Sequence, residues 1–177
     1  MKGNQFHNEF YQMVRIFADR FLAMVLLVIL SPVILLGCIL VKTDGGPIFF
    51  RQIRLGKNAK EFSVLKLRTM IVGADKYLDN HGMPTRKRTT WAGSFLRKSS
   101  IDELPQLVNI LKGEMALIGP RPILPRMLPF MTELEKQRFD VAPGVTGLAQ
   151  VKGRNHQKWS LRFRYDVFYS RKMSFPL

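Results

Sequence analysis

The stretch Phe21–Val41, with the sequence FLAMVLLVILSPVILLGCILV, carries no charged residue and decides the fold of the N-terminal part of the chain. As a straight helix it would be roughly 30 Å long, which matches the hydrocarbon core of a bilayer. It is longer than the apolar region of a typical signal peptide, and Lys42-Thr43-Asp44 follows it where a signal peptide has small residues. We therefore expect a retained membrane segment in residues 1–42, followed by a domain on the membrane face in residues 43–177.

Ser31-Pro32 lies at the middle of this run. Pro32 has no N–H to donate to the Val28 carbonyl and its ring crowds the preceding turn, so the helix should bend there, while the Ser31 hydroxyl can bond a freed carbonyl. Basic residues flank the run on both sides: Arg15 and Arg20 before it, and Lys42, Arg51, Arg54, Lys57 and Lys60 after it. The positive-inside bias then places both flanks in the cytoplasm. The residues leave two arrangements open, a re-entrant helix that returns to the same face and an ordinary kinked transmembrane helix.

The charge of the chain points to an anionic partner. Lys and Arg number 28 against 13 Asp and Glu in 177 residues, a formal net charge of +15. A nucleic acid, an acidic membrane surface or a phosphorylated substrate would each fit this charge. The one cysteine, Cys38, lies in the apolar run, which excludes an internal disulfide framework and a Cys/His metal cluster.

Turn residues and apolar patterns divide the rest of the chain. They predict a β-hairpin in residues 47–70 around Gly56-Lys57-Asn58, a polar loop in 72–88, helices in 102–111, 132–139 and 158–172, and an irregular proline-rich segment in 118–129. The last helix fits either the membrane interface or a place on the protein core. The expected fold class is α+β and mainly helical, with a small β-hairpin and interface-lying amphipathic helices around a compact cytosolic domain.

Two adjacent acids, Asp102 and Glu103, stand in the stretch SSIDELPQL, residues 99–107. The two serines before them have the capping-box spacing, and acids in a first turn favour the helix dipole. With Asp102 as the N-cap, Pro105 falls at the third helical position, where its missing N–H costs nothing. Unpaired N–H groups at a helix start also bind phosphate, but an ionised Asp beside a phosphate needs a divalent cation or arginines to offset the charge. The pattern is therefore compatible with a simple cap and with a phosphate site.

Several basic residues could complete such a site. Arg97 lies five residues before Asp102, Arg121 lies in the proline-stiffened GPRP, Arg154 ends the glycine-rich PGVTGLAQVKGR, and Lys66 lies in KLRTM. Each of them alone also fits a solvated surface charge, and Lys66 fits the outward face of a strand equally well. Together with the acid pair and a membrane anchor, they indicate phosphoryl-group chemistry on an amphiphilic substrate.

The ordered series of these motifs resembles one family, the bacterial sugar transferases, or monotopic polyprenol-phosphate phosphoglycosyl transferases. The series runs over nearly the whole chain: the Ser31-Pro32 break, GGPIFFRQIRLGKN (45–58), KLRTM (66–70), FLRKSSIDELPQLVNILKGEM (95–115), LIGPRP (117–122) and APGVTGLAQVKGRN (142–155). The resemblance implies a re-entrant helix with both ends in the cytoplasm. It also implies a place at the bacterial cytoplasmic (inner) membrane, in contact with its lipid, with the catalytic domain on the cytosolic face.

The resemblance implies a reaction as well. The family transfers a sugar-1-phosphate from a UDP-sugar to polyprenol (undecaprenyl) phosphate, releases UMP and uses Mg²⁺, as the first membrane step of bacterial glycoconjugate assembly. On matching positions, Asp102 would be the nucleophile that forms a covalent phosphosugar intermediate. Glu103 would assist by holding the metal together with Asp102 or by activating the polyprenol phosphate. Arg97, Arg121 and Arg154, with Lys66 as a weaker candidate, would hold phosphates.

The chain departs from the family pattern at three positions. Lys152 stands where the family has Asn, and Glu114 and Ala116 stand where it has Asp and Ser, so no role is assigned to these residues. Family members usually continue beyond the position of Leu177, so the resemblance predicts a shortened C-terminus. It implies neither the sugar nor the oligomeric state.

The alternative to an enzyme is a basic membrane-anchored module that binds anionic lipid or nucleic acid without catalysis. The basic residues argue against it, because they are scattered among Pro and Gly motifs and are not interleaved with stacking aromatics along one face. We therefore expect no nucleic-acid partner.

Overall fold

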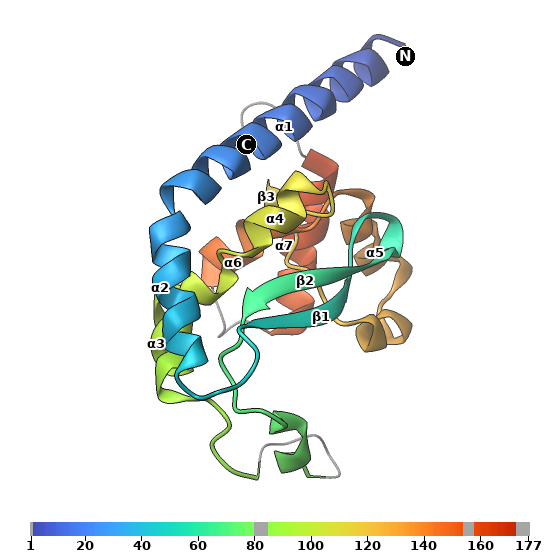
Figure 1. Ribbon diagram of the computed structural model, residues 1–177. Coiled ribbons are helices and arrows are strands. Elements are labelled where there is room, and N and C mark those ends of the chain that lie inside the picture. Colours follow the sequence, from blue (N-terminus) through green and yellow to red (C-terminus); the bar gives the residue numbers. More distant parts are fainter. Residues whose placement is uncertain (1, 80–84, 154–157, 173–177) are drawn as a thin grey trace.

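The computed structural model describes residues 2–79, 85–153 and 158–172, and its long N-terminal helix is broken where the sequence predicts it (Figure 1). Helices α1 (Lys2–Ile29) and α2 (Ser31–Lys42) meet at an angle of 62°. The Ser31 hydroxyl donates to the Val28 carbonyl over 2.7 Å, in place of the N–H that Pro32 lacks. The bend and its chemical cause are both confirmed.

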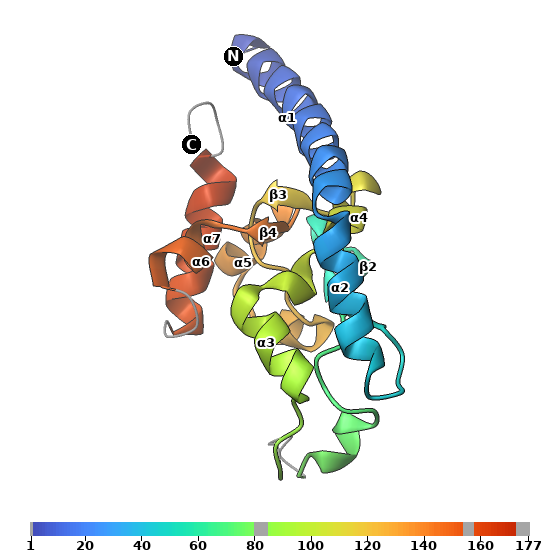
Figure 2. The same cartoon turned by 60° about the vertical axis from the view of Figure 1, so that its left-hand side comes forward.

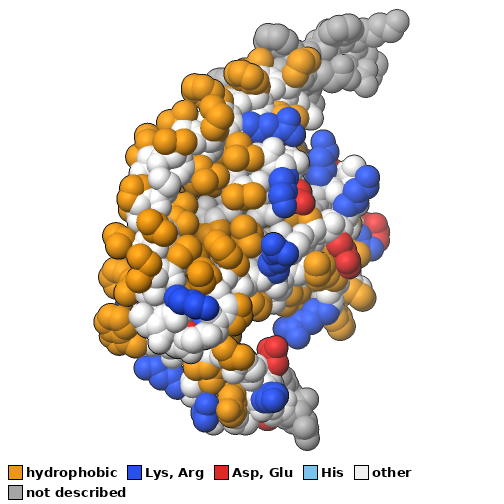
Figure 3. Space-filling model, in the orientation of Figure 1, with side chains coloured by type: hydrophobic (Ala, Val, Ile, Leu, Met, Phe, Trp, Pro, Cys, Tyr) orange, Lys and Arg blue, Asp and Glu red, His pale blue; other side chains and the backbone are white. Residues whose placement is uncertain are grey.

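The outer side of this bent pair is apolar. Large side chains such as Phe17, Val28 and Leu35 are 61–74% exposed, and Figure 3 shows hydrophobic side chains covering this flank of the molecule. Within the described residues no single helix is long and apolar enough to cross a membrane. The bent pair Tyr11–Ile29 and Ser31–Lys42, taken together, has sufficient length and an apolar enough composition. Either of the two membrane arrangements that the sequence left open would place this apolar surface in lipid.

The inner side of the pair packs on the domain. Ala23 of α1 lies in a buried cluster with Val64, Leu107 and Ile110. Val41 of α2 packs with Leu67 and Leu96 in a second cluster. A Cβ on Gly37 would lie 2.7 Å from the Leu67 side chain, so α2 approaches the β-hairpin closely. Both helices are therefore part of the core of the described structure.

The predicted hairpin is confirmed. Strands β1 (Phe49–Leu55) and β2 (Glu61–Leu67) pair antiparallel across the turn η1 (Lys57–Ala59), where Asn58 and Ala59 have positive φ. In this register Phe50 faces Lys66 and Arg54 faces Phe62. Opposed residues share a face of the sheet, so Arg54 and Lys66 lie on the same side of the hairpin.

The helix predicted for residues 102–111 differs from the prediction at its start. Helix α3 (Trp91–Ser99), which the sequence analysis missed, is followed by the separate 3₁₀ turn η3 (Ile101–Glu103), and α4 spans Gln106–Leu111. Ser100 adopts φ 59°, a left-handed conformation that ends α3 and redirects the chain before the acids. Gly113 ends α4 with φ 80°, as predicted.

The second half of the chain alternates short strands and helices. Its remaining elements are β3 (Ala116–Ile118), η4 (Pro125–Phe130), α5 (Glu133–Lys136), η5 (Gln137–Asp140), β4 (Gly144–Thr146), α6 (Leu148–Gly153) and α7 (Trp159–Lys172), while η2 (Ala74–Tyr77) lies earlier, within the predicted loop. Strands β3 and β4 pair in parallel. The predicted helix 132–139 is divided into α5 and η5, and α6 forms where glycine and proline had suggested only breaks. The α+β, mainly helical class is confirmed.

Helix α7 packs on the domain core. Its Phe163 joins a cluster with Leu55, Ile123 and Phe139, and Val167 and Tyr169 are also buried. This face fits the core-packing alternative of the two that the sequence left open. Figure 2 shows α6 and α7 on the side of the domain away from α2, while the last turns of α7 lie near α1, where the Arg15 guanidinium carbon is 5.8 Å from the Tyr169 ring centre.

Candidate active site

Asp102 and Glu103 lie in the 3₁₀ turn between α3 and α4, and the helix cap that was one of the two alternatives left open by the sequence does not form. The Ser99 hydroxyl donates to the Phe95 and Leu96 carbonyls at 3.0 and 3.1 Å, and Ser100 forms no side-chain cap. The left-handed Ser100 separates the serines from α4, which removes the capping-box geometry. Both carboxylates are therefore available for other contacts.

Glu103 is the centre of an ion-pair cluster. Lys66 Nζ lies 2.7 Å from Glu103 Oε1, and Arg121 reaches the same oxygen at 2.6 Å and Oε2 at 3.3 Å. Burial alone would raise the pKa of Glu103, but the hydrogen bonds and charges of Arg121 and then Lys66 outweigh it and lower this pKa to about 2. Glu103 is therefore ionised throughout the physiological range.

Asp102 differs from its neighbour in both environment and pKa. Its side chain is buried, with 7% exposure, and burial raises the pKa of Asp102 against the opposing positive charge of Lys66, while the negative charge of Glu103 raises it further. The two cations direct their ion pairs to Glu103 and not to Asp102. A poorly solvated carboxylate beside basic groups suits nucleophilic attack on a phosphorus atom.

The predicted basic residues divide into three cases. Lys66 and Arg121 meet at Glu103, so the site alternative for Lys66 is the one the geometry favours. Burial lowers the pKa of Lys66, which Glu103 partly offsets. Arg97 contributes a positive charge near Asp102, but its Nε donates to Thr69 Oγ1 at 2.8 Å. Arg154 lies outside the described residues.

Arg54 is a site residue that the sequence analysis missed. Its guanidinium donates to Gln52 Oε1 at 2.6 Å and to the Pro122 carbonyl at 3.3 Å. Burial lowers the pKa of Arg54, and the nearby charges of Arg121 and Arg126 lower it further. The alternation of the β1 strand was the available signal, because it places Arg54 and Lys66 on one face. Arg54, Lys66 and Arg121 together form a basic surface suited to a diphosphate.

Arg68, by contrast, has a structural role. Its side chain is buried and bonds to the Asp44 carboxylate and to the carbonyls of Pro47 and Met70. It therefore ties the chain leaving α2 to the end of the hairpin.

The two acids are compatible with a Mg²⁺ site whose remaining ligands come from the substrate and from water. No group of three His, Cys, Asp or Glu capable of holding a metal occurs in the described part of the chain. Mg²⁺ commonly takes one or two carboxylates and fills its octahedron with substrate phosphates and water. Asp102 and Glu103 are the carboxylates that could hold such an ion, and both Glu103 oxygens accept hydrogen bonds from Lys66 or Arg121 in the free enzyme.

Comparison with known proteins identifies the family. The model of the family described as "Bacterial sugar transferase" matches residues 10–177. The uncharacterised sugar transferase EpsL of Bacillus subtilis is 46% identical over 133 residues, 75% of this chain and 65% of that protein. The exopolysaccharide production protein ExoY of Sinorhizobium fredii is 39% identical, covering 88% of this chain and 76% of that protein.

A further relative has a name that states its reaction. The UDP-glucose:undecaprenyl-phosphate glucose-1-phosphate transferase of Xanthomonas campestris is 37% identical, covering 98% of this chain and 38% of that protein. The chain thus spans about two thirds of EpsL and little more than a third of the Xanthomonas protein. The chain belongs to the bacterial sugar transferase family. Membership confirms the family expected from the sequence and favours an enzyme over the non-catalytic binding module.

Proposed function

We propose that the chain is a polyprenol-phosphate phosphoglycosyl transferase that moves a sugar-1-phosphate from a UDP-sugar to polyprenol phosphate and releases UMP. The observation that carries this proposal is the buried Asp102 beside a Glu103 held by Lys66 and Arg121. The names of two relatives support the same reaction class. One is the UDP-glucose:undecaprenyl-phosphate glucose-1-phosphate transferase of Xanthomonas campestris, and the other is the undecaprenyl-phosphate galactose phosphotransferase of Salmonella typhimurium.

The reaction would proceed in two displacements. A carboxylate oxygen of Asp102 attacks the sugar-bearing phosphorus of the UDP-sugar, and the bond from that phosphorus to the bridging oxygen breaks, so that UMP leaves with the electron pair. The phosphate oxygen of polyprenol phosphate then attacks the same phosphorus. This step releases the Asp102 carboxylate and forms polyprenyl-diphosphate-sugar.

The surrounding residues would stabilise charge during both steps. Arg121 and Lys66 neutralise Glu103 in the free enzyme and offer donors to the phosphate oxygens, and Arg54 adds positive charge behind them. Glu103 orients both cations, and its low pKa suits it to act through its charge and not as a base. Mg²⁺ held by Asp102 and Glu103 would neutralise charge on the diphosphate.

The proposal includes a place on the cytosolic face of the bacterial inner membrane. The 62° bend, the apolar outer side of α1 and α2 and the packing of both helices on the domain support a re-entrant path. Single cysteines at Gln5 and Thr43, in a Cys38→Ser background, would be labelled from the same side of sealed vesicles. Labelling from opposite sides would establish a spanning helix instead.

The reaction itself is tested by UMP release. The full chain in nanodiscs, given a panel of UDP-sugars, Mg²⁺ and polyprenol phosphate, should release UMP with at least one sugar. Mass spectrometry of enzyme quenched without polyprenol phosphate should find a phosphosugar adduct on Asp102. An active enzyme from which no adduct can be trapped would contradict the covalent route.

A further inference from the structure

The loop Gly119–Pro122, which carries Arg121, is held by groups outside itself. Prolines 120 and 122 have no N–H, so the loop has few donors of its own. Its carbonyls accept instead from other segments: that of Pro120 from Gly144 N at 3.0 Å, that of Pro122 from Arg54 at 3.3 Å, and that of Arg121 from Arg138 at 2.7 Å. The first two donors belong to β4 and β1, and the third is a buried charged side chain.

Arg138 is itself fixed by α7. Its Nε and one terminal nitrogen both donate to Asp166 Oδ2, at 3.1 and 2.7 Å. The two side chains are only 2% and 5% exposed. The guanidinium carbon also lies 5.4 Å from the Phe139 ring centre and 5.2 Å from that of Phe163. The Arg138 guanidinium is therefore held between a carboxylate and two rings, with one nitrogen directed at the Arg121 carbonyl.

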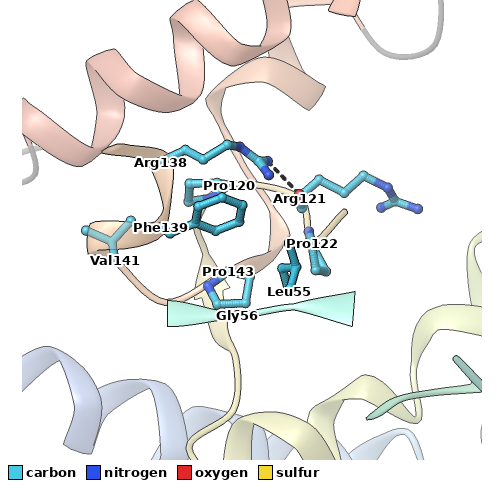
Figure 4. Close-up of a pocket in the computed structure, with 9 residues that line it drawn as sticks. All are labelled: Leu55, Gly56, Pro120, Arg121, Pro122, Arg138, Phe139, Val141 and Pro143. Carbon is cyan, nitrogen blue, oxygen red and sulfur yellow. Dashed lines mark hydrogen bonds between the residues drawn. The ribbon is translucent and has the colours of Figure 1, made fainter. Parts of the chain in front are cut away.

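Figure 4 shows how this arrangement relates to the active site. The Arg138 guanidinium points at the backbone of Arg121, while the Arg121 guanidinium extends away from the pocket. That second guanidinium is the one that binds Glu103. A continuous series of contacts thus leads from Asp166 through Arg138 and the Arg121 backbone to Glu103.

Stability alone gives a poor account of this buried pair. Two buried charges are costly to desolvate, and well-packed apolar residues of similar volume commonly stabilise a fold equally well. A charged donor at the end of a fixed side chain does, however, provide a strong hydrogen bond to a loop carbonyl.

We propose that Arg138 and Asp166 are positioning residues of the active site, which hold the Arg121 backbone so that its guanidinium reaches Glu103 and the substrate phosphates. This inference rests on the proposed function. It assigns no contact with substrate to either residue.

The test is a double-mutant cycle in the full chain in nanodiscs, with UMP release as the readout. The paired replacement Arg138→Met/Asp166→Leu removes both charges together and leaves neither unpaired. We expect it to fold, as judged by thermal unfolding, and to lower kcat/KM by about 10- to 100-fold, because a small displacement of a phosphate-binding group has effects of this size.

The decisive comparison uses Arg121→Met. If Arg138 and Asp166 act through Arg121, adding their replacement to Arg121→Met lowers kcat/KM by no more than about twofold further. Arg138→Lys, which keeps a charged donor, should retain more activity than Arg138→Met. Independent effects that multiply in the combined variant, or a folded paired variant with the activity of the parent, would overturn the inference.

Two further measurements keep the result unambiguous. Glu133→Gln/Lys136→Met removes an exposed ion pair of 2.7 Å on neighbouring α5 and should leave UMP release unchanged. If the paired replacement does not fold, the same cycle is run with Arg138→Lys, whose loss of activity must likewise disappear in the Arg121→Met background. Failure of the parent chain to release UMP from any UDP-sugar would count against the proposed function and not against the positioning role.

Discussion

Lys66 Nζ lies 2.7 Å from Glu103 Oε1, and through this ion pair the β-hairpin contacts the turn that carries Asp102. The same Glu103 oxygen accepts from Arg121, at 2.6 Å, on a loop from the second half of the chain. Three separate segments therefore meet at one carboxylate, and the buried Asp102 lies next to it. The proposed roles of these residues lead to three measurable consequences, and a fourth prediction concerns the buried Asn109.

Asp102→Asn should lower the rate of UMP release by about 10³-fold or more, because the amide cannot attack phosphorus and no covalent intermediate can form. The measurement is UMP release with and without polyprenol phosphate, together with a search for the adduct by mass spectrometry. Asp140→Asn, at an exposed acid in η5, is the matched control and should have the activity of the parent. Parent-level activity in Asp102→Asn would exclude this residue as the nucleophile.

Lys66→Met should reduce kcat/KM by about 10- to 100-fold, because it removes one of the two cations paired with Glu103 and one donor to phosphate. UDP-sugar titrations provide kcat and KM separately. Lys60→Met removes an exposed lysine immediately before the start of the same strand and should change neither. Equal effects of the two substitutions would indicate that Lys66 acts only through the net charge.

Glu103 should make the stability of the protein depend on pH in the acid range. The pKa of Glu103 in the fold is about 2, against an ordinary value of 4.5, so its stabilising effect is complete above about pH 4.5 and is lost as the pH falls towards 2. The difference corresponds to roughly 3 kcal/mol. Thermal unfolding in metal-free buffer should show a gap between parent and Glu103→Gln that is largest near neutral pH and narrows on acidification. A gap independent of pH would contradict this assignment.

Asn109 should be needed for stability, because its buried side chain pairs with the edge of β2. Its Oδ1 accepts from Leu65 N at 3.0 Å and its Nδ2 donates to the Ser63 carbonyl at 2.8 Å. Asn109→Leu keeps the volume but leaves both backbone groups without these partners, at a cost of about 2–4 kcal/mol. Thermal unfolding measures the loss. Lys112→Met, at the exposed end of α4, should be nearly neutral.

Some expectations from the sequence were wrong because contacts between distant segments changed the local conformation. The capping box at residues 99–103 fails because Ser100 turns left-handed, and nothing in the SSIDE letters indicates that conformation. Helix α6 forms in a glycine-rich stretch because α7 packs against it. Helix α3 begins at the N-cap Thr90, which lies outside the motifs named in the sequence analysis. Arg68, to which the sequence assigned no role, is buried because Asp44 and three backbone carbonyls surround it.

The sequence by itself determined the features that depend on neighbouring residues. The bend at Ser31-Pro32 follows from a missing N–H and a nearby hydroxyl, the hairpin from alternation around a turn, and the family from the order of its motifs. Tertiary structure alone decided which cations reach Glu103, because Lys66 and Arg121 lie 37 and 18 residues away in the sequence. It also decided the burial of Asp102 and the link from Asp166 through Arg138 to Arg121. Such contacts depend on how distant segments pack, and residue spacing does not encode that packing.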